Sequence, residues 1–213
     1  MQIEKIEVGS YCANCYFVSD ERTRRTLIID PGAEAEQLIR HIEHRQLLPE
    51  GIAITHGHFD HVGAAAALSQ KWHLPIWIHG QEIAYMQERS HPIMSMGAEV
   101  LDELLAALPQ NGRYVSDQEA FEAAGQKWQA IEVPGHTDHS LCFYHAEAGI
   151  LFSGDTLFAG SVGRTDLYHG EAAELIRQIR EKLLRLPDET RVLPGHGMET
   201  TIGRERKENP FLW

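Results

Sequence analysis

The stretch THGHFDH, residues 55–61, follows directly on the apolar, strand-like run GIAI of residues 51–54. Four side chains of the kinds that bind metal ions fall within its last six positions, namely His56, His58, Asp60 and His61. A packed core does not tolerate so many polar groups without partners. In a regular strand the first three would share one face and the fourth would point to the other. The stretch therefore predicts two ligand sets, with His56 and His58 serving one metal ion and Asp60 and His61 serving a second.

Three further strand-like runs end in a residue of the same kind. Residues 130–133, 150–152 and 191–193 lead, each through a glycine, to His136, Asp155 and His196. In an open α/β sheet, sites form outside the carboxyl ends of strands, because the loops of neighbouring strands converge there. A glycine before each of these side chains lets the backbone approach closely. We expect His136 and His196 to complete the two sets, one each, and Asp155 to bridge them through its two carboxylate oxygens.

Apolar runs rich in β-branched residues alternate along the chain with runs of helical periodicity. Strands are predicted at residues 26–29, 51–54, 75–78, 130–133, 150–152 and 191–193. Helices are predicted over residues 34–47, 62–72, 99–108 and 171–186. The alternation predicts the α/β class, and both halves of the chain carry strands and a long helix, which fits two stacked sheets with helices outside. No low-complexity linker interrupts residues 1–213, so we predict a single domain.

The composition limits the classes of protein that fit. The chain has 213 residues, 43% of them hydrophobic and 23% charged, which is typical of a globular protein and excludes fibrous or disordered chains. A formal net charge of −12 opposes binding to nucleic acid, whose phosphates attract a basic face. The N-terminus MQIEKIEVGSY lacks the features of a signal peptide, and no apolar run reaches the roughly 20 residues of a membrane span. We therefore expect a cytoplasmic protein with no nucleic-acid partner and no membrane partner.

Other residues with metal-binding side chains are assigned structural roles. Cys12 and Cys15 form a Cys-x-x-Cys, but no second such pair completes a zinc site, so both are expected to fill space in a strand over residues 11–18. His41 and His44 lie three apart without a third ligand and are interpreted as a solvated helix face. The remaining histidines outside the two ligand sets are interpreted as surface or hydrogen-bonded residues, and His79 and His169 are candidates for positions beside the site or at its rim.

Together with PGHT (residues 134–137), SGDTLF (153–158) and PGH (194–196), the stretch THGHFDH resembles the metallo-β-lactamase superfamily. Within it, the chain is most similar to the short, single-domain bacterial hydroxyacylglutathione hydrolases, also called type II glyoxalases. The resemblance implies an αββα sandwich of two stacked mixed sheets flanked by helices. It also implies two divalent metal ions, zinc by default and iron or manganese as alternatives. The first ion would be bound by His56, His58 and His136 and the second by Asp60, His61 and His196, with Asp155 bridging.

The resemblance further implies a hydrolase that cleaves S-lactoylglutathione to lactate and glutathione. A hydroxide generated between the two metal ions would attack the acyl carbon of this small-molecule thioester, and Asp60 would orient the hydroxide. The Arg164 guanidinium would either hold a substrate carboxylate or pair with Asp166. Longer relatives carry a helical C-terminal segment after the last histidine that contacts glutathione. The chain ends soon after His196 without such a segment, so weaker or altered recognition of glutathione is expected.

Two alternatives stay open at the level of the sequence. Persulfide dioxygenases share the histidine cluster but use a mononuclear iron site, and they carry a Gly-Arg-x-Asp segment that GRTD, residues 163–166, resembles. Against this interpretation, Asp60 and His196 lie in motifs that support a second metal ion. The second alternative is the hydrolysis of another small ester or thioester at the same centre.

Overall fold

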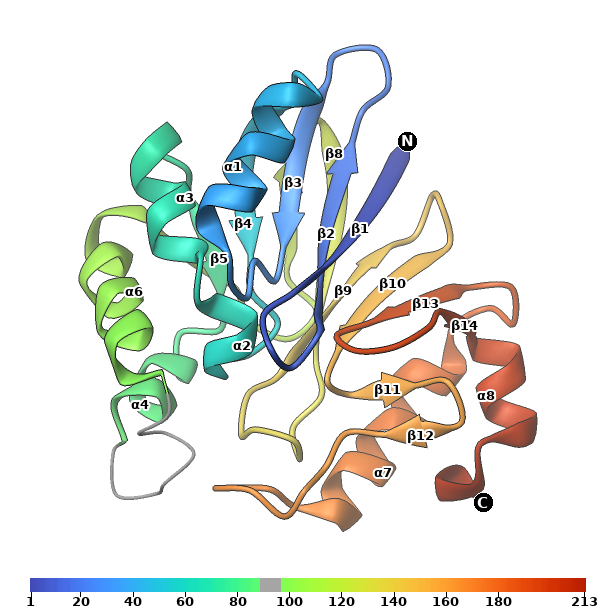
Figure 1. The fold of residues 1–213 in the computed structure, drawn as a ribbon. Coiled ribbons are helices and arrows are strands. Elements are labelled where there is room, and N and C mark those ends of the chain that lie inside the picture. The colour runs from blue at the N-terminus through green and yellow to red at the C-terminus, as the bar shows by residue number, and fades with distance from the viewer. Residues whose placement is uncertain (89–96) are drawn as a thin grey trace.

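Two mixed β-sheets packed face to face form the centre of the molecule, which confirms the predicted fold class (Figure 1). The computed structural model describes residues 1–88 and 97–213. In these residues the first sheet has the order β1-β2-β3-β4-β5-β6, formed by β1 (Gln2–Val8), β2 (Ala13–Ser19), β3 (Arg25–Ile29), β4 (Leu48–Ala53), β5 (Ile76–Ile78) and β6 (Gly112–Tyr114). The second sheet has the order β14-β13-β10-β9-β8-β7, formed by β7 (Ala120–Ala123), β8 (Gln126–Glu132), β9 (Leu141–His145), β10 (Ile150–Gly154), β13 (Arg191–Pro194) and β14 (Thr200–Thr201). A separate hairpin consists of β11 (Leu157–Phe158) and β12 (Ser161–Val162).

Helices cover the outer face of each sheet (Figure 1). The first sheet is covered by α1 (Ala35–His44), α3 (Ala65–Trp72) and α6 (Ala98–Asn111), with the short α2 (Phe59–Val62) and α4 (Glu82–Gln87) beside them. The second sheet is covered by α7 (Ala172–Glu181) and α8 (Ile202–Glu208), with the 3-10 turns η1 (Leu183–Arg185) and η2 (Pro210–Leu212). Helical crossovers make β3 to β6 parallel, and α7 connects β10 to its parallel neighbour β13. Among the described residues, every helix is too short or too polar to cross a bilayer.

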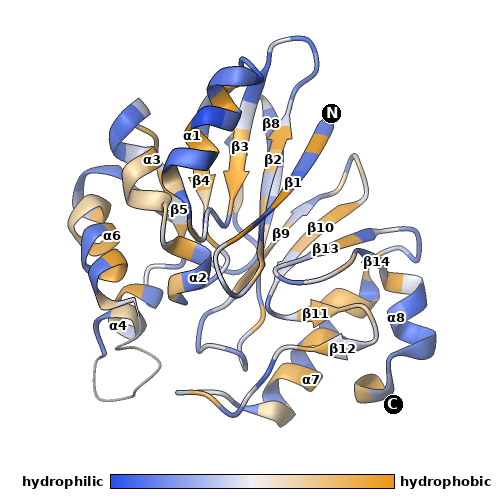
Figure 2. Cartoon of the chain, viewed as in Figure 1, coloured by the Kyte–Doolittle hydropathy of each residue, from blue (hydrophilic) through white to orange (hydrophobic). Residues whose placement is uncertain are grey.

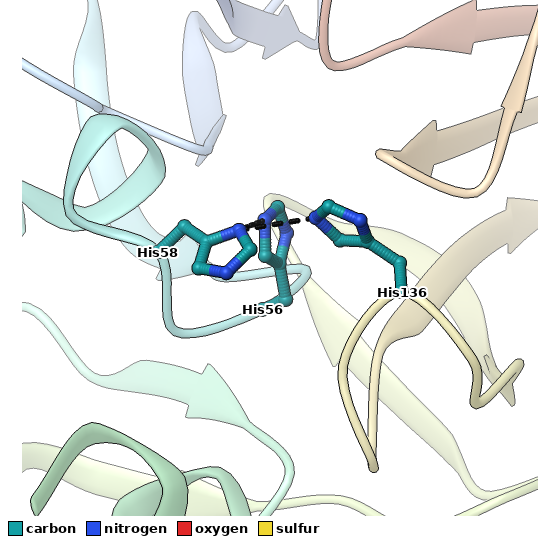
Figure 3. Close-up of side chains that lie close together, drawn as sticks. All are labelled: His56, His58 and His136. Atoms are coloured by element: carbon teal, nitrogen blue, oxygen red, sulfur yellow. Dashed lines mark hydrogen bonds between the residues drawn. The ribbon is translucent and has the colours of Figure 1, made fainter. Parts of the chain in front are cut away.

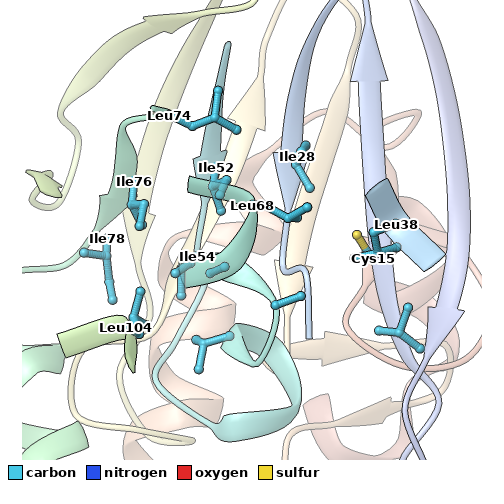
Figure 4. Close-up of a cluster of buried hydrophobic side chains, with 14 of the residues drawn as sticks. Cys15, Ile28, Leu38, Ile52, Ile54, Leu68, Leu74, Ile76, Ile78 and Leu104 are labelled. Atoms are coloured by element: carbon cyan, nitrogen blue, oxygen red, sulfur yellow. The ribbon is translucent and has the colours of Figure 1, made fainter. Parts of the chain in front are cut away.

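The two-residue period of the strands explains how the first sheet is buried on both faces. In β2, Cys15 and Phe17 point toward the helices, whereas Tyr16 and Val18 point toward the second sheet. Aliphatic side chains fill the layer under the helices (Figure 4), and the layer between the sheets contains the fully buried Trp128. A third apolar layer packs under α7 and α8. Figure 2 shows the same division, with hydrophobic strands inside and hydrophilic residues on the outer faces of the helices. The order of layers is helix, sheet, sheet, helix.

Two predicted helices differ in the structure. The helix predicted over residues 62–72 begins at Ala65 as α3, and Val62 is the last residue of the separate α2. Between the two helices the N–H of Gly63 donates to the carbonyl of Gly32 at 3.1 Å. A Cβ at Gly63 would overlap that carbonyl oxygen, so the close approach requires glycine. The helix predicted over residues 171–186 ends at Glu181 and continues as the 3-10 turn η1.

The two N-terminal cysteines have different environments. Cys15 is fully buried in the core, as predicted. The prediction was wrong for Cys12, which lies exposed in the turn before β2 with a φ of 53°. Both cysteines are free thiols.

Candidate metal centre

The structure brings together all seven side chains that the sequence assigned to metal ions. The loop after β4 carries His56 and His58, and α2 carries Asp60 and His61. The loops that follow β8, β10 and β13 carry His136, Asp155 and His196. The carboxyl ends of strands from two facing sheets therefore supply one common site, in the manner of other α/β proteins.

The first set is a cluster of three buried imidazoles (Figure 3). His56 Nε2 and His136 Nε2 each lie 3.0 Å from His58 Nδ1, and the rings are nearly perpendicular to one another. Nitrogens bound to one tetrahedral zinc ion are separated by about 3.3 Å, so this spacing fits one ion. Burial, reinforced by neighbouring imidazoles, lowers the pKa of His56 and His58, and burial lowers the pKa of His136. The three rings are therefore neutral and offer lone pairs to a cation.

The second set surrounds Asp155. His61 Nε2 lies 3.3 Å from His196 Nε2 and 3.4 Å from Asp155 Oδ1. Asp60 Oδ2 lies 3.5 Å from His196 Nε2, and Asp155 Oδ2 lies 3.7 Å from His136 Nε2 of the first set. Asp155 Oδ1 is buried and has no hydrogen-bond partner among the described residues, an arrangement that is unfavourable unless a cation binds there. The donor atoms thus fit two ions with Asp155 between them.

Asp30 lies behind the second set and orients the ring of His61. The sequence analysis did not predict this role. The buried carboxylate of Asp30 accepts hydrogen bonds from the Thr55 N–H at 2.8 Å and the Thr55 hydroxyl at 2.6 Å. The same carboxylate accepts a hydrogen bond from His61 Nδ1–H at 3.0 Å, and Thr55 Oγ1 lies 3.0 Å from His56 Nδ1. Partners of this kind fix the orientation and raise the basicity of a ligating imidazole. The signal was available, because Asp30 directly follows β3 as the predicted ligands follow their own strands.

The other two imidazoles of the first set are oriented in the same way. His58 directs Nδ1 into the set, and its Nε2–H donates to the Tyr85 hydroxyl at 2.7 Å. His136 Nδ1–H donates to the carbonyl of Arg164 at 2.8 Å. No sequence pattern marks Tyr85, because a tyrosine in a short helix is also an ordinary partly buried residue. Each imidazole of the first set therefore has its outer nitrogen paired, which is usual for metal ligands.

Glycines leave room for the site where two loops meet. A Cβ added at Gly195 would overlap Asp155 Oδ1 and lie 2.7 Å from His61 Cε1. The N–H of Gly195 donates to the carbonyl of Gly154 at 2.8 Å and so joins the loops that follow β10 and β13. Gly154 has a φ of 49°, in the left-handed region that favours glycine. The close approach predicted for these glycines is confirmed.

A cavity of about 350 Å³ opens onto both ligand sets. Its apolar wall is formed by Tyr11, Phe59, Phe158, Val162 and Leu167. Arg164 also lines the cavity, and its guanidinium donates to the Asp166 carboxylate in two hydrogen bonds of 2.8 and 2.9 Å. The site is therefore a metal-type centre at the base of a largely apolar cavity with one cationic side chain.

A third group of metal-type side chains, His79, Glu132 and His139, lies elsewhere. His139 Nδ1–H donates to Glu132 Oε1 at 2.7 Å, and His79 Nε2 lies 3.9 Å from the same oxygen. The two imidazole planes are stacked at 12° with centroids 4.6 Å apart. A metal ion lies in the plane of an imidazole that binds it, and one ion does not lie in two nearly parallel planes at once. We interpret this group as a hydrogen-bonded stack.

The two ligand sets differ in protonation in the absence of metal. Burial opposes a positive charge on His61, but nearby carboxylates outweigh burial and raise the pKa of His61 to about 10. These carboxylates belong to Asp155, Asp30 and Asp60. For His196, burial is likewise outweighed by the hydrogen bond to Asp60, and the pKa is raised. A cation that enters the second set must displace a proton, whereas the first set holds none at neutral pH.

As the pH falls, we expect the ion in the second set to be lost before the ion in the first. A proton held with a raised pKa competes with a cation at every pH below that pKa, so the affinity of the second set decreases progressively as the pH falls below about 10, the pKa of His61. The lowered pKa values of the first set delay proton competition to more acidic conditions. Metal content after dialysis at each pH should fall from two ions to one, and then to none. Simultaneous loss of both ions would contradict this expectation.

The chain is similar to several known proteins. The family model described as "Metallo-beta-lactamase superfamily" matches residues 12–196. "Hydroxyacylglutathione hydrolase GloC" of Haemophilus influenzae is 38% identical over 100% of this chain and 98% of its own length. The structure of "BLEG-1 B3 metallo-beta-lactamase" matches with a TM-score of 0.86 and 32% identity, covering 99% of both chains. The structure of "TTHA1623 in a di-iron-bound form" matches with a TM-score of 0.80 and 35% identity, covering 98% of this chain and 100% of that one.

Proposed function

Because this chain belongs to the metallo-beta-lactamase superfamily, we propose that it cleaves the thioester S-lactoylglutathione to lactate and glutathione at a two-metal centre. The observation that carries the proposal is the position of the Asp155 carboxylate between the two ligand sets. Its Oδ1 lies 3.4 Å from His61 Nε2, and its Oδ2 lies 3.6 Å from His196 Nε2 and 3.7 Å from His136 Nε2. A relative that is 38% identical over 98% of its length bears the name hydroxyacylglutathione hydrolase, which supports this substrate. In the proposal the two ions are held by His56, His58 and His136 and by Asp60, His61 and His196, with Asp155 between them.

Two divalent ions bound in these sets would supply the Lewis acidity that lowers the pKa of water and polarises an acyl carbonyl. Asp60 lines the cavity, where its carboxylate would accept a hydrogen bond from the attacking water and orient the water toward the acyl carbon. Burial alone would raise the pKa of Asp60, but the hydrogen bond from His196 and the charge of His61 lower it, so Asp60 remains an anion. The apolar wall offers contact surface to the uncharged part of the substrate. A thiolate is a good leaving group, so the chain needs no general acid.

The donor atoms do not select one metal. Imidazole and carboxylate groups suit zinc, iron and manganese alike, and the two sets contain no thiolate. We propose zinc, with iron and manganese as alternatives. Iron is a specific alternative because TTHA1623, at 35% identity, has a structure in a di-iron-bound form.

Metal analysis of the purified protein together with turnover of S-lactoylglutathione tests the proposal. We expect two ions per chain and an activity that chelation abolishes and added metal restores. A series of thioesters with different thiols then tests recognition of glutathione. A kcat/KM that does not depend on the thiol would remove the glutathione conjugate as substrate and leave thioester hydrolysis. Full activity after complete chelation would reject the two-metal centre.

Arg164→Ala should raise the KM for S-lactoylglutathione about tenfold and leave kcat nearly unchanged. The Arg164 side chain is 62% exposed at the cavity, and its pair with Asp166 is a weak, solvent-exposed ion pair, so a substrate carboxylate can replace Asp166. A hydrogen bond to a charged group contributes about 1.5–3 kcal/mol, and about 1.4 kcal/mol corresponds to tenfold. Steady-state kinetics measure the change. A thioester whose thiol lacks carboxylates serves as the control, and its KM should be the same for the parent and for Arg164→Ala. An unchanged KM for S-lactoylglutathione would show that Arg164 only shapes its loop.

Other reactions can be tested on the same preparation. GRTD, residues 163–166, favours a persulfide dioxygenase, for which one iron per chain and oxygen uptake on glutathione persulfide are expected. The arrangement of Asp60, His61 and His196 around the Asp155 carboxylate favours two ions instead. One similar structure, at 32% identity, is named a B3 metallo-beta-lactamase, so a β-lactam belongs in the same assay.

A further inference from the structure

Helix α4 packs directly behind the loop that carries His56 and His58. The residue between them is Gly57, and a Cβ added there would lie 2.5 Å from Met86 Cγ and 3.0 Å from Glu82 Oε2. Both of these contacts come from α4. The helix and the loop therefore touch with no space for an intervening side chain.

The Glu82 carboxylate joins this loop to a second one. Its Oε2 accepts the N–H of Gly57 at 2.7 Å. Its Oε1 accepts the hydroxyl of Thr137 at 2.8 Å and the N–H of His139 at 3.2 Å. Gly57 separates the first two imidazoles of the first set, and Thr137 directly follows the third, His136. One side chain thus spans the two loops that carry all three imidazoles.

The burial and charge of Glu82 strengthen this connection. Its exposed fraction is 0%, and within the described part of the chain its carboxylate forms hydrogen bonds but no ion pair. Burial raises the pKa of Glu82 to about 6 against the opposing effect of the hydrogen bonds from Thr137 and Gly57, so the group is an anion at neutral pH. Hydrogen bonds to an ionised acceptor are roughly twice as strong as neutral ones. Displacing either loop would leave a buried charge short of a donor, which is costly.

The next turn of the same helix contacts the first set directly. Tyr85 lies three residues after Glu82 and therefore on the same side of α4. Its hydroxyl accepts the hydrogen bond from His58 Nε2–H at 2.7 Å. Through Glu82, α4 thus holds the backbone of both loops of the first set. Through Tyr85, it also holds the ring of His58.

We propose that Glu82 is a positioning residue that holds the two loops at a fixed separation, so that His56, His58 and His136 converge before a cation binds. This inference rests on the proposed two-metal centre and adds to it the device that organises the first set. Glu82 does not face the reacting atoms and acts through the loops. The expected consequence of its loss is a weaker and less regular metal site in a chain that still folds.

Glu82→Gln tests the proposal, because the carboxamide keeps the shape of the side chain but turns one of its two acceptors into a donor. We expect the apparent Kd of the first-set ion, measured by competition with a chelator of known affinity, to rise about tenfold. The visible absorption bands of the Co(II)-loaded protein should shift or broaden, and kcat should fall while KM stays constant. Thr137→Val removes only the hydroxyl donor and should weaken metal binding in the same way. Because both changes affect the same contact between Glu82 and Thr137, the rise in Kd of the double variant should be smaller than the product of the two single rises.

Glu205→Gln is the matched control. Glu205 is 1% exposed and accepts the Thr200 hydroxyl at 2.6 Å and the Gly160 N–H at 2.8 Å, but it does not contact either loop of the first set. This variant should lower the free energy of unfolding without changing metal affinity or the Co(II) spectrum. An unchanged Kd and spectrum in Glu82→Gln, or an equal loss in both glutamine variants, would overturn the proposal. If Glu82→Gln does not fold, Thr137→Val decides by the same criteria. The Kd and the Co(II) spectrum need no substrate, so failure of S-lactoylglutathione turnover would affect the proposed function and leave this test intact.

Discussion

Asp155→Ala should lower the hydrolysis of S-lactoylglutathione by at least about three orders of magnitude. Asp155 Oδ1 lies 3.4 Å from His61 Nε2 and Oδ2 lies 3.7 Å from His136 Nε2, so its loss weakens both ligand sets at once. Lewis-acid stabilisation of the transition state amounts to several kcal/mol, and each 1.36 kcal/mol corresponds to about a factor of ten in rate. Steady-state rates and the metal content of the purified variant measure the effect.

The fold should survive this substitution. Asp155 Oδ1 has no hydrogen-bond partner among the described residues, so in the metal-free chain the substitution mainly removes a carboxylate that lies 3.4 Å from His61 Nε2. Asp30 and Asp60 still face His61, so the chelated variant should fold, with a lower free energy of unfolding than the chelated parent. Asp155→Asn keeps the size of the side chain and one carbonyl oxygen. Its activity should lie between that of the parent and that of Asp155→Ala. A variant with alanine that retains two ions and full turnover would reject the bridging role.

Gly195→Ala should lower activity at least about 100-fold and reduce the metal content from two ions to one. The added methyl group would overlap Asp155 Oδ1 and lie 2.7 Å from His61 Cε1, so these two side chains must move apart. A misplacement of about 1 Å in a catalytic site costs on the order of 100-fold in rate. Metal analysis and steady-state kinetics of the same sample measure both consequences.

Gly197→Ala provides the control for this substitution. Gly197 has a φ of 74°, so alanine there introduces left-handed strain of about 1 kcal/mol, but its Cβ would meet no atom within 4 Å. Activity and metal content should remain close to those of the parent. Equal losses in the two variants would show that backbone strain in this loop, rather than crowding of the ligands, explains the effect.

The convergence of the seven candidate ligands could be predicted because each follows an apolar strand, and strand ends meet at one edge of an α/β fold. Asp30 follows the same rule, but it is a single carboxylate at the end of a strand, and the sequence alone does not show that it lies behind His61 and contacts Thr55. Glu82 and Tyr85 could not be predicted in this way. Their partners lie 25 and 27 residues away in the sequence, and only the packing of α4 against the loop brings them together.

The fold class was also predictable, but several elements were not. The long helices and central strands have clear periodicity, whereas β14 contains two residues and α4 six, too few to show a period. The division between α2 and α3 depends on the contact of Gly63 with Gly32, which is a tertiary interaction absent from local propensity. The exposure of Cys12 depends on a turn with positive φ that the run YCANCYFV does not reveal.

Each half of the chain holds an incomplete share of the metal centre. The half that forms the first sheet contributes residues 56–61, and the half that forms the second contributes His136, Asp155 and His196. Bound cations would cross-link the two halves in addition to the packing between the sheets. A cation present at 100 times its Kd adds about 2.7 kcal/mol to the free energy of unfolding. Metal scarcity in the cell would then expose the chain to proteolysis and reduce the amount of protein as well as its activity.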